Sequence, residues 1–158
     1  MMDDKVFTDK LLSSEKRLYR MAATLLPCEA DRLDAMQETA LRAWQSRRSL
    51  REERYFTTWL TRILINECRS LQRRQRRLVL MDQPPDVPAP PDGDPELRLM
   101  LESLPFRQRE ALCLFYLEGF SIREMARILR IPEGTVKYRL HEARKALKVE
   151  LTQKEATL

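Results

Sequence analysis

The stretch SIREMARILRIPEGTVKYRLHEARKAL, residues 121–147, decides the fold class. It begins with Ser121, a good helix N-cap, and Glu124 stands three residues later, where it completes a capping box. Apolar residues recur at helical spacing on both sides of a short turn, which contains Pro132, a residue suited to the first turn of a helix. Two helices joined by so short a turn predict a helix-turn-helix, whose second helix enters the DNA major groove.

The second helix of this motif has one apolar face, and the residues around that face are candidates for DNA contact. The inward residues are Val136, Leu140, Ala143 and Leu147. A reading helix needs cations for phosphates and side chains that reach base edges. Together with one residue of the first helix, the candidate DNA-binding residues are Arg123, Lys137, Tyr138, Arg139, His141, Glu142, Arg144 and Lys145. A polar helix on an ordinary helical bundle is the alternative interpretation.

Upstream of this motif, a proline-rich segment divides the chain. The stretch DQPPDVPAPPDGDP, residues 82–95, holds six prolines and four aspartates. Proline lacks the backbone donor and disfavours helix in the residue before it. We therefore expect an extended linker over residues 81–95, between one domain at residues 1–80 and another at residues 96–158. No alternating apolar pattern argues for a strand, so the predicted fold class is all-α, with two small helical domains.

The first domain reads as three helices. The first stops near Pro27, the second follows from about Glu29, and the third begins near Tyr55. The apolar positions at helical spacing in the second helix are Leu33, Met36, Ala40, Leu41 and Trp44.

The third helix and the segment before it are rich in arginine. Between Gln45 and Arg77, ten arginines stand against three glutamates. Guanidinium groups bind phosphate oxygens bidentately, and aromatic rings among them can stack on unpaired bases. Phe56 and Trp59 are assigned mainly to the core, whereas Tyr55 is undecided. A solvated helix end is the alternative interpretation of the charge.

Composition narrows the class of protein further. The chain has 158 residues, a net charge of +5 and a sequence pI near 9.3, which suits a polyanionic partner. Its three cysteines are far apart and it has a single histidine, so we expect no metal site and no other cofactor. Cysteines among apolar residues indicate buried thiols in a reducing cytoplasm. The N-terminus lacks a signal-peptide pattern, and no apolar run is long enough for a membrane span.

Longer motifs in both domains point to one family. The first domain contains DAMQETALRAW (Asp34–Trp44) and RYFTTWLTRILINECRSLQRR (Arg54–Arg74). The second contains LPFRQREALCLFYLEGFSIREMARILRIPEGTVKYRLHEARKAL (Leu104–Leu147). These motifs resemble regions 2 and 4 of the extracytoplasmic-function (ECF) sigma factors, bacterial RNA polymerase subunits of the sigma-70 family. The resemblance implies that residues 1–80 are sigma region 2 and that residues 96–158 are sigma region 4.

The resemblance implies a transcription initiation factor that is not itself an enzyme and has no small-molecule substrate. It would bind core RNA polymerase, both at the clamp coiled coil of the largest subunit and at the flap, and would direct it to promoter DNA. An anti-sigma factor is a further expected partner, without insertion of the chain into a membrane. The implied polymerase-binding residues are Asp34, Gln37, Glu38 and Arg42. The implied residues for recognition and melting of the −10 element are Arg47, Arg51, Tyr55, Thr57, Thr58, Arg62, Asn66, Arg69 and Arg73. The helix-turn-helix would read the −35 element.

Five positions depart from the family pattern. Leu33 stands where an acid is usual, and Ala40 where an aromatic residue is usual. Arg130 replaces the common turn glycine, which predicts a strained or differently shaped turn. Tyr138 replaces a frequent serine and Glu142 a frequent arginine on the reading helix, so we expect a −35 preference that differs from that of better-known members.

Two other classes of protein were weighed. A stand-alone helix-turn-helix regulator would have little use for the second helix, which carries the implied polymerase-binding residues. It would also have little use for the QRRQRR segment that ends the arginine run. An enzyme or nuclease would need a phosphate-binding loop, paired histidines or a dense carboxylate cluster, and the sequence has none of these.

Overall fold

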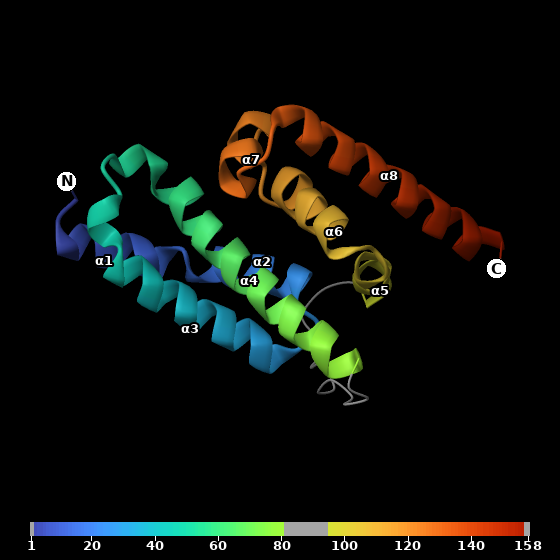
Figure 1. Ribbon diagram of the computed structural model, residues 1–158, viewed down its shortest axis with the longest axis horizontal. Helices are drawn as coiled ribbons and strands as arrows, with labels where there is room; N and C mark the ends of the chain where they lie inside the picture. The colour runs from blue at the N-terminus through green and yellow to red at the C-terminus, as the bar shows by residue number, and fades with distance from the viewer. Residues whose placement is uncertain (1, 81–94, 157–158) are drawn as a thin grey trace. The chain divides into compact units, whose positions relative to one another are not determined.

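The computed structural model describes residues 2–80 and 95–156. The chain divides into two compact units, residues 1–89 and residues 90–158. Both are built from helices, and none of the described residues forms a strand (Figure 1). The predicted all-α fold class is therefore confirmed. The predicted linker lies outside the described residues, apart from Pro95, which begins a helix.

The first unit packs its helices around one core (Figure 1). Its helices are α1 (Asp4–Ser13), α2 (Glu15–Leu25), α3 (Glu29–Gln45) and α4 (Phe56–Leu80). The connection between α3 and α4, residues 46–55, contains two short 3₁₀ turns, η1 (Arg47–Ser49) and η2 (Glu53–Tyr55), and is called the α3–α4 loop below. α3 lies along α4, and α2 packs on both.

The segment before Pro27, for which the sequence predicts one helix, forms two helices, α1 and α2. The hydroxyl groups of Ser13 and Ser14 both donate to the carbonyl of Lys10, at 2.9 and 2.8 Å. Serine hydroxyls that bond nearby carbonyls compete with the helical backbone pattern. The apolar residues of the two helices consequently belong to separate elements.

After Arg32 near its start, the fully buried residues of α3 have small side chains. Ala35, Thr39 and Ala43 are fully buried there. Leu33 and Leu41, by contrast, each leave 49% of their surface exposed. The apolar positions that recur at helical spacing in the sequence therefore do not coincide with the fully buried side of α3. Close packing of α3 against α4 leaves room only for small residues between the two helices, so the larger apolar side chains lie outside.

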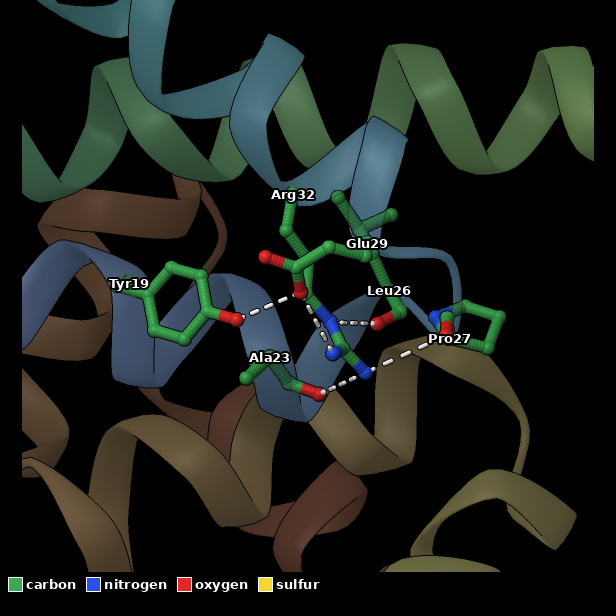
Figure 2. A network of polar contacts seen from close by, with 6 residues as sticks. All are labelled: Tyr19, Ala23, Leu26, Pro27, Glu29 and Arg32. Carbon is green, nitrogen blue, oxygen red and sulfur yellow. Dashed lines mark hydrogen bonds and ion pairs between the residues drawn. The ribbon is translucent and has the colours of Figure 1, made fainter. Parts of the chain in front are cut away.

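A buried arginine joins the end of α2 to the start of α3 (Figure 2). Arg32 is fully buried, and its Nε donates to the carbonyl of Leu26 at 2.8 Å, while Nη2 donates to that of Pro27 at 3.3 Å. Its Nη1 also pairs with Glu29 at 3.3 Å. The last carbonyls of a helix lack helical partners, and a cation there is favourable. Tyr19 donates its hydroxyl to Glu29 at 2.6 Å, and this bond, with burial and the carboxylate charge, raises the pKa of Tyr19.

The second unit contains the helix-turn-helix. Its helices are α5 (Pro95–Ser103), α6 (Phe106–Leu112), α7 (Ile122–Leu129) and α8 (Glu133–Ala156), with a π-helical turn, η3 (Cys113–Leu117), after α6. α6 and α7 both pack on α8 (Figure 1).

The second unit also uses a buried arginine to complete a helix end. Arg109 donates from Nη1 to the carbonyls of Leu101 and Glu102, both at 3.4 Å, near the end of α5. Burial lowers the pKa of Arg109, because the low-dielectric interior disfavours its charge. The carbonyl groups offset part of that cost by accepting from the guanidinium.

The helix-turn-helix has the local structure that its sequence predicts. The Ser121 hydroxyl accepts from the Glu124 backbone at 3.1 Å, and the Glu124 carboxylate accepts from the Ser121 backbone at 3.0 Å, so the capping box is confirmed. Arg130 ends α7 in the left-handed region, with φ 55°. This region is strained for a residue with a Cβ, which confirms the expectation from the missing glycine.

The three cysteines, Cys28, Cys68 and Cys113, are buried and form no disulfide, as predicted for buried thiols. None of the helices in the described part of the chain is long and apolar enough to cross a membrane. Among those same residues, no group of side chains is arranged to hold a metal ion.

Candidate nucleic-acid and polymerase interfaces

Helix α8, the second helix of the helix-turn-helix, has an exposed polar face. Lys137, Tyr138, His141 and Lys145 are all exposed and lie opposite the buried side of the helix. Tyr138 leaves 64% of its surface exposed. His141 lies three residues from Tyr138 and four from both Lys137 and Lys145, so these side chains share one side of the helix and combine cations, an imidazole and an aromatic ring. Such a set can contact phosphates and base edges in a groove.

Three other predicted DNA-binding residues lie around this face. Arg139 and Glu142 are half-buried at its edge, and Arg123 is exposed on α7. Half-burial restricts the reach of the first two side chains. They are therefore placed to support the face rather than to form its centre.

Arg144 lies on α8 but is directed toward another part of the second unit. Its Nε donates to the hydroxyl of Tyr116, and its guanidinium carbon lies 5.5 Å from the centre of that ring. The ring centre of Phe115 is 5.8 Å away. A guanidinium over aromatic faces is stabilised by the ring quadrupole. The structure therefore separates Arg144 from the polar face of α8.

An apolar cavity of about 350 Å³ lies beside Arg144. The residues that line it come from α5, α6, η3 and α8: Leu101, Leu112, Cys113, Tyr116, Leu117, Arg144, Leu147 and Lys148. Its size falls within the range of about 300–1,000 Å³ that is usual for binding pockets. Because its walls are mostly apolar, it fits an apolar protein segment better than it fits DNA.

In the first unit, α4 carries a basic face. Arg62, Asn66, Arg69 and Arg73 follow one another at spacings of four, three and four residues, so they share one side of the helix. Asn66 and Arg73 are exposed, whereas Arg62 and Arg69 are half-buried. The structure thus brings these four predicted DNA-binding residues together.

The α3–α4 loop and the first turn of α4 hold four further predicted residues. Arg51 and Thr57 are exposed, and Tyr55 leaves 40% of its surface exposed. Arg54 lies over the Tyr55 ring at 4.8 Å. Thr58 is half-buried and donates its hydroxyl to the Tyr55 carbonyl at 3.0 Å. The loop therefore presents an exposed aromatic ring with one arginine over it.

Arg47 begins the same loop but is bound within the first unit. Its Nε lies 2.9 Å from Asp4 of α1, and its Nη1 donates to the carbonyl of Trp44 at 2.8 Å. Its guanidinium carbon is 3.8 Å from the centre of the Trp44 indole, and only 20% of the side chain is exposed. A direct contact between Arg47 and DNA stays a prediction.

The outer face of α3 combines acidic and apolar side chains. Asp34, Gln37 and Glu38, which the family resemblance implies as polymerase-binding residues, are exposed there. Leu33 and Leu41 lie four residues to either side of Gln37 and so belong to the same face. Sequence reasoning named both leucines as apolar positions but did not include them among the polymerase-binding residues, although their spacing from Gln37 was a signal. The apolar cavity of the second unit was also missed, because its lining residues come from four separate elements and no spacing in the sequence connects them.

Arg42, the fourth predicted polymerase-binding residue, connects two helices of the first unit. Its Nε lies 2.6 Å from a Glu67 carboxylate oxygen on α4 and 3.6 Å from Glu38 on its own helix. The Glu67 side chain is only 14% exposed, which strengthens a pair that would be weak in open solvent. Arg42 thus connects the acidic outer face of α3 to α4.

Comparison with known proteins agrees with this arrangement. The family model described as Sigma-70 region 2 matches residues 12–78, and that described as Sigma-70, region 4 matches residues 95–147. The ECF RNA polymerase sigma factor SigM of Mycobacterium tuberculosis is 33% identical over 150 residues, which span 91% of this chain and 76% of that protein. The chain belongs to the ECF RNA polymerase sigma factors. The ECF sigma factor EcfG of Rhodopseudomonas palustris is 36% identical over 149 residues, which span 88% of this chain and 81% of that protein.

Two solved structures of protein complexes also contain a chain that resembles this ECF sigma factor. The sigma factor RpoE from Bartonella quintana, in complex with the anti-sigma factor NepR, has a TM-score of 0.77 and 28% identity, and the match covers 92% of this chain and 96% of that one. CnrH, in complex with the cytosolic domain of CnrY, has a TM-score of 0.74 and 26% identity, with 96% and 90% of the two chains covered.

Membership of the ECF group decides between the three classes of protein considered from the sequence. Sigma factors are transcription initiation factors and not enzymes, so the enzyme interpretation is excluded. The match to region 2 as well as to region 4 favours a sigma factor over a stand-alone helix-turn-helix regulator.

Proposed function

We propose that this ECF sigma factor binds core RNA polymerase through the outer face of α3 and recognises the −10 element through α4 and the α3–α4 loop. This proposal is supported by the different side chains that two helices of the first unit expose: acidic and apolar groups on α3, and arginines on α4. Asp34 and Glu38 lie beside exposed leucines on α3, a mixture that suits a protein partner with basic and apolar groups. Arg62, Arg69 and Arg73 on α4 suit phosphates.

Melting of the −10 element fits the chemistry of the α3–α4 loop. Tyr55 offers an exposed ring for stacking with an unpaired base, and Arg51 offers a charge for the neighbouring phosphate. Opening costs least at weakly stacked, AT-rich steps, so we expect such steps in the −10 element. Asn66 lies on the same side of α4 as the arginines and can read a base edge.

The second unit would read the −35 element and dock on the polymerase flap at the same time. The polar face of α8, with Lys137 and His141, suits the major groove. The apolar cavity beside Arg144 suits an apolar segment of the flap, and the two surfaces occupy different sides of α8. The proposed domains are residues 1–80 and 96–158, with residues 81–95 as the linker between DNA-reading units.

The proposed cellular context is the cytoplasm, with control by an anti-sigma factor. Three buried cysteines without a disulfide suit a reducing compartment. The similar sigma factor from Bartonella quintana was solved with an anti-sigma factor bound. Exposed Leu33 and Leu41 provide apolar surface that such a partner can cover.

In vitro transcription with sigma-free core polymerase and a randomised promoter pool tests the proposal. Transcripts that depend on this protein and start at a fixed distance from a shared two-part motif would support it and reveal the promoter. A reaction without the protein is the control. Binding to core polymerase without any protein-dependent transcript would contradict the role in initiation.

A further inference from the structure

The N-terminal helix α1 contacts both ends of the α3–α4 loop. Phe7 is only 2% exposed, and its ring packs against Trp44 at the end of α3, with ring centres 6.2 Å apart. The same ring packs against Phe56 and Trp59 at the start of α4, at 5.6 and 5.9 Å. Tilted and edge-to-face ring pairs are favourable beyond the area they bury. One side chain of α1 therefore bridges the two positions from which the loop starts and ends.

Two ion pairs connect α1 to the loop itself. Asp4 pairs with Arg47 of η1 at 2.9 Å, and this arginine also lies over the Trp44 ring. One helical turn past Phe7, Lys10 pairs with Glu53 of η2 at 3.0 Å. Each of the two 3₁₀ turns is thus attached to α1 by one ion pair, and the pairs have opposite polarity.

A purely structural role explains only part of this arrangement. Burial of Phe7 completes the core of the first unit whatever the shape of the loop. The carboxylates of the two pairs, on Asp4 and Glu53, are 57% and 55% exposed, and ion pairs open to solvent contribute little to stability, so two of them on one loop are poorly explained by folding alone. Both ion pairs, however, form only in one conformation of the loop. A charge of the opposite sign at any of the four paired residues would disfavour that conformation. Asp4, Phe7 and Lys10 also precede residue 12, where the match to sigma region 2 begins.

We propose that Asp4, Phe7 and Lys10, here called the α1 anchor, position the α3–α4 loop for recognition of the −10 element. This inference rests on the proposed function of the loop. With η1 and η2 held against α1, Arg51 between the two turns and Tyr55 at the end of η2 remain exposed. Tyr55 can then stack on the unpaired base, and Arg51 can contact the neighbouring phosphate. Arg47 is then a positioning residue, which acts on promoter opening through the conformation of the loop and not by contact with DNA.

Exchanging the charges of Asp4 and Arg47 tests whether Arg47 positions the loop or contacts DNA directly. The experiment uses the full-length protein bound to core polymerase. The variants are Asp4→Arg, Arg47→Asp and the double variant that carries both changes. Permanganate reactivity of unpaired thymines measures promoter opening on a cognate promoter, and fluorescence anisotropy measures affinity for core polymerase. We expect each single variant to open about fivefold less promoter, and the double variant to return to within about twofold of the natural protein. Affinity for core polymerase should stay unchanged, because the outer face of α3 is untouched.

The outcomes distinguish failure of this inference from failure of the proposed role of the α3–α4 loop in recognition of the −10 element. If the double variant is as defective as Arg47→Asp alone, Arg47 acts by contact with DNA and the inference fails. Single variants that open promoters normally would also overturn it. The exchange of Lys10→Glu with Glu53→Lys repeats the test at the second ion pair, should the first pair alter folding. Failure of the natural protein to open promoter DNA at all would instead remove the proposed function of the loop.

Discussion

Replacement of Arg32 by methionine should weaken the first unit more than any surface change of similar size. The guanidinium is fully buried, and its polar contacts hold the end of α2 to the start of α3 (Figure 2). Methionine occupies a similar elongated space, so the change removes hydrogen bonds without leaving a large cavity. The carbonyl of Leu26, which accepts from Arg32 at 2.8 Å, loses that donor.

The magnitude follows from these contacts. A short hydrogen bond to a charged donor contributes about 2 kcal/mol, and the longer bonds to neighbouring carbonyls together add about 1 kcal/mol. Glu29 loses its ion pair with Arg32, but its side chain is 36% exposed and water can replace the lost partner. We therefore expect a loss of about 3 kcal/mol in the free energy of unfolding. For a domain of this size, that corresponds to a fall in Tm of about 12–24 °C.

Tryptophan fluorescence during urea unfolding is the assay. Trp44 and Trp59, the two tryptophans of the chain, both lie in the first unit, so the signal reports on that unit alone. Arg48→Met, at an exposed position, is the matched control and should change the free energy by less than about 0.5 kcal/mol. An Arg32→Met protein within 1 kcal/mol of the natural one would refute the assignment of Arg32 as the structural cap of α2.

Three further predictions concern the two proposed interfaces and the Tyr19 hydrogen bond. Lys137→Ala combined with His141→Ala should reduce transcription from promoters that need a −35 element by about tenfold, with unchanged affinity for core polymerase; an equal loss of core binding would show that the reading face is misplaced. Asp34→Lys combined with Glu38→Lys should weaken core binding at least tenfold, measured by anisotropy, and unchanged binding would remove the assignment of the α3 face. Because the folded-state pKa of Tyr19 is raised above 10.0, the stability that its hydrogen bond provides is fully present below pH 10 and is lost as pH rises through the raised value. The stability difference between the natural protein and Tyr19→Phe should therefore shrink above pH 10, and a difference that stays constant to pH 12 would contradict the argument.

The sequence alone determined features that depend on neighbouring residues. The capping box of Ser121 and Glu124, the strain in the turn at Arg130 and the inward stripe with Val136 and Leu140 all follow from interactions within a few residues. Helix caps and the helical period act over that range, so the pattern of residue types is enough to predict them. The all-α class and the family followed from the same kind of pattern.

The tertiary structure alone decided which predicted side chains face outward and which are bound within the protein. Arg42, Arg47 and Arg144 all read as surface cations, but their partners are Glu67, Asp4 and Tyr116, each on another element. A long charged side chain has several reachable directions, and the element packed beside it selects one.

The outward position of Leu33 and Leu41 was decided in the same way. Small residues on the other side of α3 allow that helix to approach α4 closely, and the helical period does not reveal which apolar face will be the buried one. The ion pair of Asp4 and Arg47 joins residues 43 positions apart, and no local pattern in the sequence predicts a contact over that separation. Only the packing of α1 against the α3–α4 loop brings those two charges together.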